Sequence, residues 1–138
     1  MNLEIKENAL TPDIFIELRK HDFIKSYLYE DVKIALAHDL FDVVMFQDGV
    51  AIGMARLIGD GRISFIIKDF VVHSKNQKNG YGRMLMESLL NYIKKHAADG
   101  AYIGLMSTPG KESFYEKFGF IKRPNDDFGS GMVMFYEK

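Results

Sequence analysis

Dense apolar stretches separated by glycine turns dominate the middle of the chain. Residues 41–47 form an apolar strand, and Asp48-Gly49 directly after them is the strongest hairpin signal in the sequence. Residues 50–58 are therefore expected to return as a second strand. A glycine turn at 59–61 precedes a further strand over 62–72. This pattern predicts a meander of antiparallel strands.

Before the meander, the sequence pattern predicts a short strand followed by helices. Residues 3–7, LEIKE, alternate apolar and polar positions as a short strand does. Thr11-Pro12-Asp13 marks a helix start, because threonine is a good N-cap and proline fits the first helical position. A second short helix is predicted over residues 30–38.

After residue 72 the spacing of the apolar residues changes from the spacing typical of a strand to that typical of a helix. Residues 82–97 carry apolar side chains on one helical face, and 101–106 follow as a short buried strand. A helix that joins two strands favours a parallel pair. Another helix is expected from Pro109 to Gly119. The segments 120–122 and 132–136 are expected to form a C-terminal strand pair.

These elements predict a mixed α/β fold: an antiparallel meander, a parallel strand–helix–strand crossover and the C-terminal strand pair. The chain has 138 residues, which suits one domain over residues 1–138. With 47% apolar residues, 27% charged residues and a net charge of −1, the sequence gives no reason to expect nucleic acid or membrane as a partner. We expect a cytoplasmic protein, since no signal peptide pattern is present.

Metal and thiol chemistry have no support in the sequence. The chain contains no cysteine, and its four histidines lack metal-ligand spacing. No metal is therefore expected.

A glycine-containing turn stands where the strand over 62–72 gives way to the helix over 82–97. Glycines leave backbone N–H groups uncovered, and at a helix start these groups meet the positive end of the helix dipole. Such a turn is a pocket for phosphate or pyrophosphate, although a glycine turn without a ligand is the alternative. The candidate cofactor-binding residues of this turn are Gln77, Lys78, Asn79, Gly80, Tyr81, Gly82 and Arg83.

Two motifs give this turn a family context. Gln-x-x-Gly-x-Gly after Asp69-Phe70-Val71-Val72 resembles the acetyl-CoA-binding motif of the GNAT superfamily of N-acetyltransferases. Residues 113–120, SFYEKFGF, resemble the Phe-Tyr-x-Lys-x-Gly-Phe segment of that family. The order of elements fits over nearly the whole chain. Within the family, residues 67–82 look locally similar to glucosamine-phosphate acetyltransferases.

The resemblance implies a reaction and a set of roles. A primary amine, expected to belong to a small molecule, would attack the thioester of acetyl-CoA. Pantetheine would lie along the backbone of Phe70, Val71 and Val72, with an N–H near Val71 donating to the developing oxyanion. Tyr115 would be the general acid that protonates the leaving thiolate and would also contact the cofactor. A homodimer is the family-level expectation.

The general base and the acceptor site are left open by the residues. Asp69 is a candidate base and amine ligand, because it precedes the strand residues that would carry the thioester; the alternative is a structural hydrogen bond. His73 is a further candidate base. Acceptor-side residues are expected among residues 21–23, at Tyr29, and at Asp126 and Asp127; the alternative for the two aspartates is a structural role in a turn.

Two other functions compete with this reading. One is acetylation of a protein or peptide, which would require an open groove. The other is a non-catalytic module that binds acyl-CoA, against which the presence of Tyr115 argues.

Overall fold

The computed structural model describes residues 2–20 and 26–138, and the chain divides into two compact units. The first unit spans residues 1–104 and contains the whole sheet. The second spans residues 105–138.

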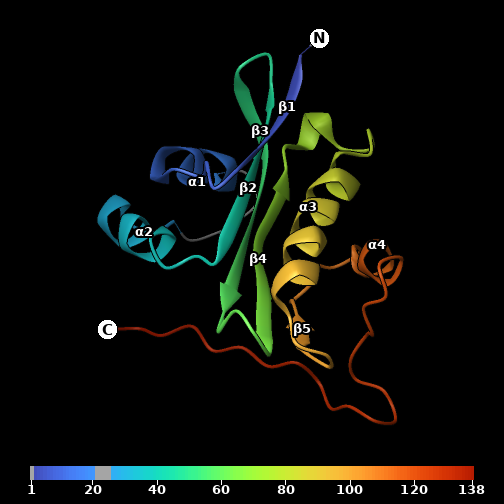
Figure 1. Cartoon of the computed structure of the whole chain (residues 1–138). Helices are drawn as coiled ribbons and strands as arrows, with labels where there is room; N and C mark the ends of the chain where they lie inside the picture. The colour runs from blue at the N-terminus through green and yellow to red at the C-terminus, as the bar shows by residue number, and fades with distance from the viewer. Residues whose placement is uncertain (1, 21–25) are drawn as a thin grey trace. The chain divides into compact units, whose positions relative to one another are not determined.

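The first unit is built on a five-stranded sheet in the order β1-β2-β3-β4-β5, as Figure 1 shows. The first four strands pair antiparallel with their neighbours, and β5 pairs parallel with β4. The predicted meander and parallel crossover are therefore confirmed. The strand bounds are β1 Leu3–Glu7, β2 Phe41–Gln47, β3 Val50–Gly59, β4 Ser64–Val72 and β5 Tyr102–Gly104.

The hairpin between β2 and β3 turns at Asp48-Gly49, as its sequence predicts. Both residues have positive φ, 50° for Asp48 and 81° for Gly49. A two-residue turn with two positive φ angles matches the right-handed twist of the flanking strands. Asp48 also accepts a hydrogen bond from the Asn2 N–H at 2.8 Å, which fixes the start of β1 against the hairpin.

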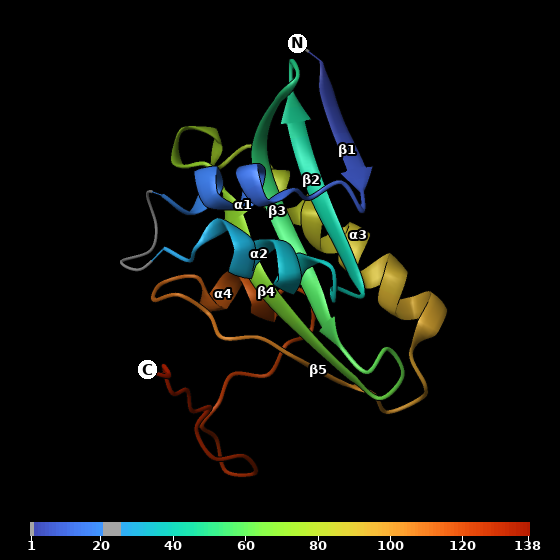
Figure 2. The ribbon, with the colours of Figure 1, turned by 90° about the vertical axis from the view of Figure 1, so that its left-hand side faces the viewer.

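Helices cover both faces of the sheet (Figures 1 and 2). Helix α1 (Pro12–Arg19) and helix α2 (Tyr29–Leu36) lie on one face, and α3 (Tyr81–His96) lies on the other. Thr11 caps α1 by accepting the Ile14 N–H at 3.3 Å. On the α1 side, the buried cluster consists of Leu10, Phe15, Leu18, Val32, Val44, Met54 and Val71.

On the α3 face, the apolar stripe of the helix supplies buried Leu85, Met86, Leu89 and Ile93. The ring of Phe41 in β2 stacks on Tyr92, with ring centroids 4.7 Å apart. Gly53 of β3 lets the helix approach the sheet, because a Cβ at this glycine would lie 3.3 Å from Cδ1 of Leu85. These contacts place the start of α3 beside the end of β4.

A bulge interrupts β4 where it pairs with β3. Met54 pairs with Val71 and Arg56 with Lys68, so Ala55 stands opposite two residues, Asp69 and Phe70. Asp69 adopts φ 50°, a left-handed conformation that aspartate tolerates better than most residues. An extra residue of this kind bends a strand and re-aims the residues that follow it.

The pairing of β4 with β5 covers only the first part of β4. The register runs from Ser64↔Tyr102 to Ile66↔Gly104 and ends there. Residues 67–72 of β4 continue beyond β5, and the bulge lies within this extension. The last part of β4 thus has β3 on one side and no sheet partner on the other among the described residues.

The second unit contains one short helix, α4 (Glu112–Glu116), and no strand in residues 105–138. The expectation of a C-terminal strand pair over 120–122 and 132–136 is therefore wrong in this structure. The segment 132–136 does carry apolar residues, but its side chains are exposed, with Met134 88% exposed. An apolar pattern forms a strand only where a neighbouring strand completes its hydrogen bonds, and the pattern itself cannot supply that neighbour.

Candidate functional site

The turn that follows β4 ends in an open helix start. After Val72 the chain makes a short 3-10 turn at Ser74–Asn76 and then reaches Gly80, the N-cap of α3. Gly80 adopts φ 80° and ψ 8°, and no side chain caps the helix. A glycine suits this left-handed position, and a Cβ there would meet nothing within 4 Å.

This geometry fits an anion such as a pyrophosphate. The first N–H groups of α3 have no intrahelical partner and no capping side chain, and they lie at the positive end of a 16-residue helix. Residues 77–80 are exposed, as is Arg83 in the first turn of the helix. The turn therefore combines uncovered backbone donors with the nearby cations Lys78 and Arg83, which is the composition of a phosphate site.

Side chains hold this turn from within. Nε2 of Gln77 donates to the carbonyl of Val72 at 2.9 Å, and Nδ2 of Asn79 donates to the carbonyl of Asn76 at 3.1 Å. Asn76 is itself buried and donates to Gln47 of β2 at 3.0 Å. Gln77 and Asn79, predicted as cofactor contacts, thus shape the loop in this structure.

The backbone direction at the end of β4 follows from one hydrogen bond. The His73 N–H donates to the carbonyl of Ile52 in β3 at 2.7 Å. Peptide groups of an antiparallel strand point alternately to its two edges. The Val71 N–H therefore points toward β3, and the Val72 N–H points toward the side that β5 does not cover. Among the predicted backbone contacts, Val72 is better placed than Val71 to donate to a ligand at that edge.

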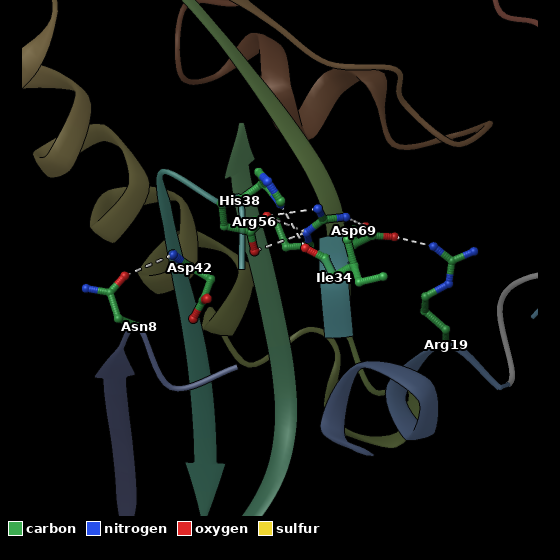
Figure 3. Close-up of polar contacts among 8 residues, drawn as sticks. Asn8, Arg19, Ile34, His38, Asp42, Arg56 and Asp69 are labelled. Atoms are coloured by element: carbon green, nitrogen blue, oxygen red, sulfur yellow. Dashed lines mark hydrogen bonds and ion pairs between the residues drawn. The ribbon is translucent and has the colours of Figure 1, made fainter. Parts of the chain in front are cut away.

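A chain of buried ion pairs converges on the β4 bulge, as Figure 3 shows. Oδ1 of Asp69 pairs with Nη1 of Arg19 at 2.5 Å, and Oδ2 of Asp69 pairs with Nη1 of Arg56 at 2.9 Å. Nη2 of Arg56 also pairs with Asp39 at 2.8 Å. We call Arg19, Asp69, Arg56 and Asp39 the ion chain. Its side chains are 3–13% exposed, so each charge depends on its partners.

Burial and pairing act in opposite senses on the pKa values of Asp39 and Arg56. Burial raises the pKa of the Asp39 carboxyl, against the hydrogen bond and charge of Arg56. Burial by itself would lower the pKa of Arg56, but Asp39 and Asp69 outweigh it and the pKa lies above the ordinary value. The two arginines and two aspartates together are neutral.

Asp69 is thus committed to the ion chain. Both of its oxygens accept from arginines. Taking a proton from an amine would weaken the pairing of Asp69 with both arginines, so the geometry favours the structural alternative for Asp69. Sequence reasoning missed Arg19, Arg56 and Asp39. Arg56 carried a usable signal: it stands in the dense apolar strand MARLI, where a charged residue needs a buried partner.

Tyr115 belongs to α4 in the second unit. It is half-buried among aromatic neighbours, in edge contact with Phe114 at 5.2 Å and Phe120 at 6.2 Å between ring centroids. Burial raises the pKa of the Tyr115 phenol. A phenol is protonated at neutral pH even at its ordinary pKa, so this shift leaves the hydroxyl protonated and makes it a weaker acid.

The acceptor-side candidates lie in different parts of the chain. Tyr29 is the first residue of α2 and is 46% exposed. Asp126 and Asp127 are exposed in the second unit, where Asn125 Oδ1 accepts the Asp127 N–H at 2.8 Å in a local turn. His73 Nδ1 accepts the Lys75 N–H at 3.4 Å. The candidates at 21–23 lie outside the described residues.

Among the described residues, no group of three or more histidine, aspartate or glutamate side chains could hold a metal ion. Within the same residues, every helix is too short or too polar to span a bilayer.

Comparison with known proteins defines the family. The acetyltransferase (GNAT) domain family matches residues 12–136, which is most of the chain and includes both motifs. The protein belongs to the GNAT acetyltransferase family. Its five-stranded mixed sheet agrees with this membership.

Relatives and solved structures agree with this assignment. The uncharacterized N-acetyltransferase ycf52 of Porphyra purpurea is 34% identical over 98 residues, 68% of this chain and 55% of the relative. The chain thus spans about half the length of the curated relatives it matches. A probable acetyltransferase from methicillin-resistant Staphylococcus aureus superposes with a TM-score of 0.88 at 30% identity, covering 98% of this chain and all of the other.

Two more distant structures share the fold alone. Glucosamine-6-phosphate N-acetyltransferase of Arabidopsis thaliana has a TM-score of 0.74 at 19% identity, covering 99% of this chain and 100% of the other. N-acetylglutamate synthase of Neisseria gonorrhoeae, in complex with coenzyme A and L-arginine, has a TM-score of 0.65 at 20% identity, covering 83% and 26%.

Proposed function

We propose that this protein is an acetyl-CoA-dependent N-acetyltransferase that acts on a primary amine of a small molecule. The observation that carries the proposal is the uncapped start of α3, which follows directly on the part of β4 that extends beyond β5. Backbone donors for a pyrophosphate and a strand edge for an extended amide chain thus lie in one segment, Phe70 to Arg83. Membership of the GNAT family supports acetyl-CoA as the ligand.

In this proposal the backbone does most of the binding. The N–H groups of Gly80, Tyr81 and Gly82 hold the pyrophosphate, and Lys78 and Arg83 add positive charge beside it. The edge of β4 at Phe70 to Val72 holds the pantetheine amides. The Val72 N–H is the donor best directed toward the thioester oxygen, where it would stabilise the negative charge of the transition state. Bound acetyl-CoA supplies the activated acetyl group.

The proton needed by the leaving thiolate comes from Tyr115. This role rests on the Phe-Tyr motif, whose tyrosine supplies a protonated hydroxyl at neutral pH. The amine must lose a proton before or during its attack, since an alkyl ammonium has no lone pair to donate. We assign no base to that step, because Asp69 is engaged by two arginines. A homodimer and a cytoplasmic location stay predictions.

Calorimetry with acetyl-CoA, followed by thiol release across a panel of amines, tests the proposal. Micromolar binding and thiol release with a small primary amine would support it. Release only with peptide acceptors would replace it with a peptide acetyltransferase. Binding without release on any acceptor would indicate an acyl-CoA-binding module. A folded protein that does not bind acetyl-CoA would overturn the proposal altogether.

A further inference from the structure

The ion chain joins three elements at the bulge of β4. Arg19 is the last residue of α1, Arg56 lies in β3, and Asp69 is the left-handed residue of the β4 bulge. Both guanidinium groups lie over the ring of Phe15, whose centroid is 5.0 Å from Arg19 Cζ and 5.7 Å from Arg56 Cζ. Side-chain packing therefore restricts the same arginines that bind Asp69.

This arrangement specifies where the extra residue of β4 sits. Strand side chains alternate between faces, so a shift of the bulge by one position would turn Asp69 away from α1. The shift would leave Arg19 and Arg56 buried without this carboxylate, which is costly. Aspartate is also among the few residues that tolerate a left-handed backbone. Ion pairing and backbone conformation thus both favour one position for the bulge.

The position of the bulge decides which peptide groups face the open edge. Before the bulge, the Ile63 carbonyl accepts the Tyr102 N–H at 2.8 Å, so odd-numbered residues of β4 point toward β5. After it, the His73 N–H points to β3, so the even-numbered Val72 points to the open edge. Removing the extra residue would exchange Val72 for Val71 at that edge.

We propose that Asp69 is a positioning residue of the acetyl transfer reaction. Through Arg19 and Arg56 it holds the bulge at 69–70 and so directs the Val72 N–H toward the thioester. This inference rests on the proposed function, since it concerns how the thioester is placed. It assigns Asp69 no proton transfer, and it adds Arg19 and Arg56 to the residues on which turnover depends.

The test compares Asp69→Asn with Lys20→Gln. Asparagine keeps the size of aspartate and its tolerance of the left-handed backbone, but it loses the charge that pairs with both arginines. Lys20→Gln removes an ion pair with Glu17 at the same end of α1, where the side chains are 58% and 66% exposed. Arg19→Lys is a milder second variant, and it tests the role of the ion chain if Asp69→Asn does not fold.

Three measurements are made on each variant: amide hydrogen exchange, acetyl-CoA affinity and turnover of an amine substrate. We expect Asp69→Asn to speed exchange at Val72 by about tenfold more than at the β2 amides, because the bulge opens locally. Turnover should fall by about tenfold to a hundredfold, since misplacement by about 1 Å costs that much. Acetyl-CoA affinity should fall less than turnover does, because the proposed pyrophosphate donors at residues 80–82 lie outside the bulge at 69–70. Lys20→Gln should match the wild type.

Equal acceleration of exchange at Val72 and in β2, with turnover per folded molecule unchanged, would show a purely structural Asp69 and overturn the inference. A shift in the pH dependence of turnover with unchanged exchange would make Asp69 a base and overturn it equally. Failure of the proposed function has a different signature, because the wild type would then show no acetyl-CoA binding or no turnover. That result would remove both proposals.

Discussion

Gln77 folds back over the turn that it begins: its side-chain amide donates to the carbonyl of Val72, five residues earlier, at 2.9 Å. The bond ties the end of β4 to the loop that leads into α3. Gln77 therefore sets the geometry of the turn, whether or not it also touches a ligand.

Replacing Gln77 tests this link. Gln77→Ala removes the bond and should weaken acetyl-CoA binding by up to about fivefold, as expected for one hydrogen bond of about 1 kcal/mol. Gln77→Glu also cannot donate to the carbonyl and adds negative charge near the expected pyrophosphate, so it should weaken binding further. Calorimetry with acetyl-CoA measures both. Equal affinity in all three proteins would mean that the Gln77–Val72 bond does not shape the binding site.

The second residue of α3 offers a sharper test of the anion site. Gly82→Asp should abolish acetyl-CoA binding, because a carboxylate at the helix start would occupy and repel the pyrophosphate. The same substitution should leave the fold intact, since an acidic residue in the first turn stabilises a helix by about 0.3–1 kcal/mol. Gly82→Ala is the matched control, which adds a methyl group without charge. Thermal unfolding and calorimetry separate stability from binding; a folded Gly82→Asp protein with wild-type affinity would contradict the site.

The role of Tyr115 is tested by removing its hydroxyl. Tyr115→Phe keeps the edge contacts with Phe114 and Phe120 and should cost at most about 1 kcal/mol of stability. Turnover should fall by about a hundredfold to ten-thousandfold if protonation of the thiolate limits the rate. Acetyl-CoA affinity should change little.

The acyl donor distinguishes protonation from positioning. A thioester with a more acidic thiol needs less protonation as its thiol leaves, so the defect of Tyr115→Phe should shrink with that donor. A defect of the same size with both donors would make Tyr115 a positioning residue. Wild-type turnover of Tyr115→Phe would remove the residue from the mechanism.

Asp60 gives a prediction about acid stability. Its Oδ1 accepts the N–H groups of Arg62, Ile63 and Ser64 at 2.8–3.0 Å, and the bonds from Arg62, Ser64 and Ile63 lower the pKa of the Asp60 carboxyl. Because the pKa is lower in the folded state, this stabilisation is complete above the ordinary value of 3.8 and is lost as pH falls through the lowered pKa.

Urea unfolding of wild type and Asp60→Ala at several pH values checks that sign. The wild type should be the more stable protein at neutral pH, and the difference should shrink below about pH 3.8. Asp60→Asn keeps an oxygen acceptor without a titrating charge, so its difference from Asp60→Ala should not vary with pH. A difference between wild type and Asp60→Ala that persists unchanged into strong acid would contradict the prediction.

Local signals in the sequence predicted most of the first unit. The Asp48-Gly49 turn and the Thr11-Pro12 helix start act over a few residues, and both are present as expected. Their hydrogen bonds close within the segment that encodes them, so a short stretch of sequence contains the needed information.

The wrong prediction, and the features that the sequence did not reveal, depend on residues far apart in the chain. The bulge at Asp69 is defined by the register of β4 against Met54 and Arg56, which no local pattern states. The ion chain joins residues 50 positions apart in the case of Arg19 and Asp69. The segment 132–136 shows the converse: its apolar residues suggested a strand, but no neighbouring strand is paired with it. Long-range pairing was therefore the missing information at each site.

The ion chain also affects how the bulge responds to heat. Hydration of charged groups becomes less favourable as temperature rises, so the penalty for keeping Arg19, Arg56, Asp39 and Asp69 out of water decreases on warming. The apolar contacts of the surrounding core gain no comparable advantage. Relative to the rest of the sheet, the irregular part of β4 should hold its conformation best in the warm and be the first to loosen in the cold.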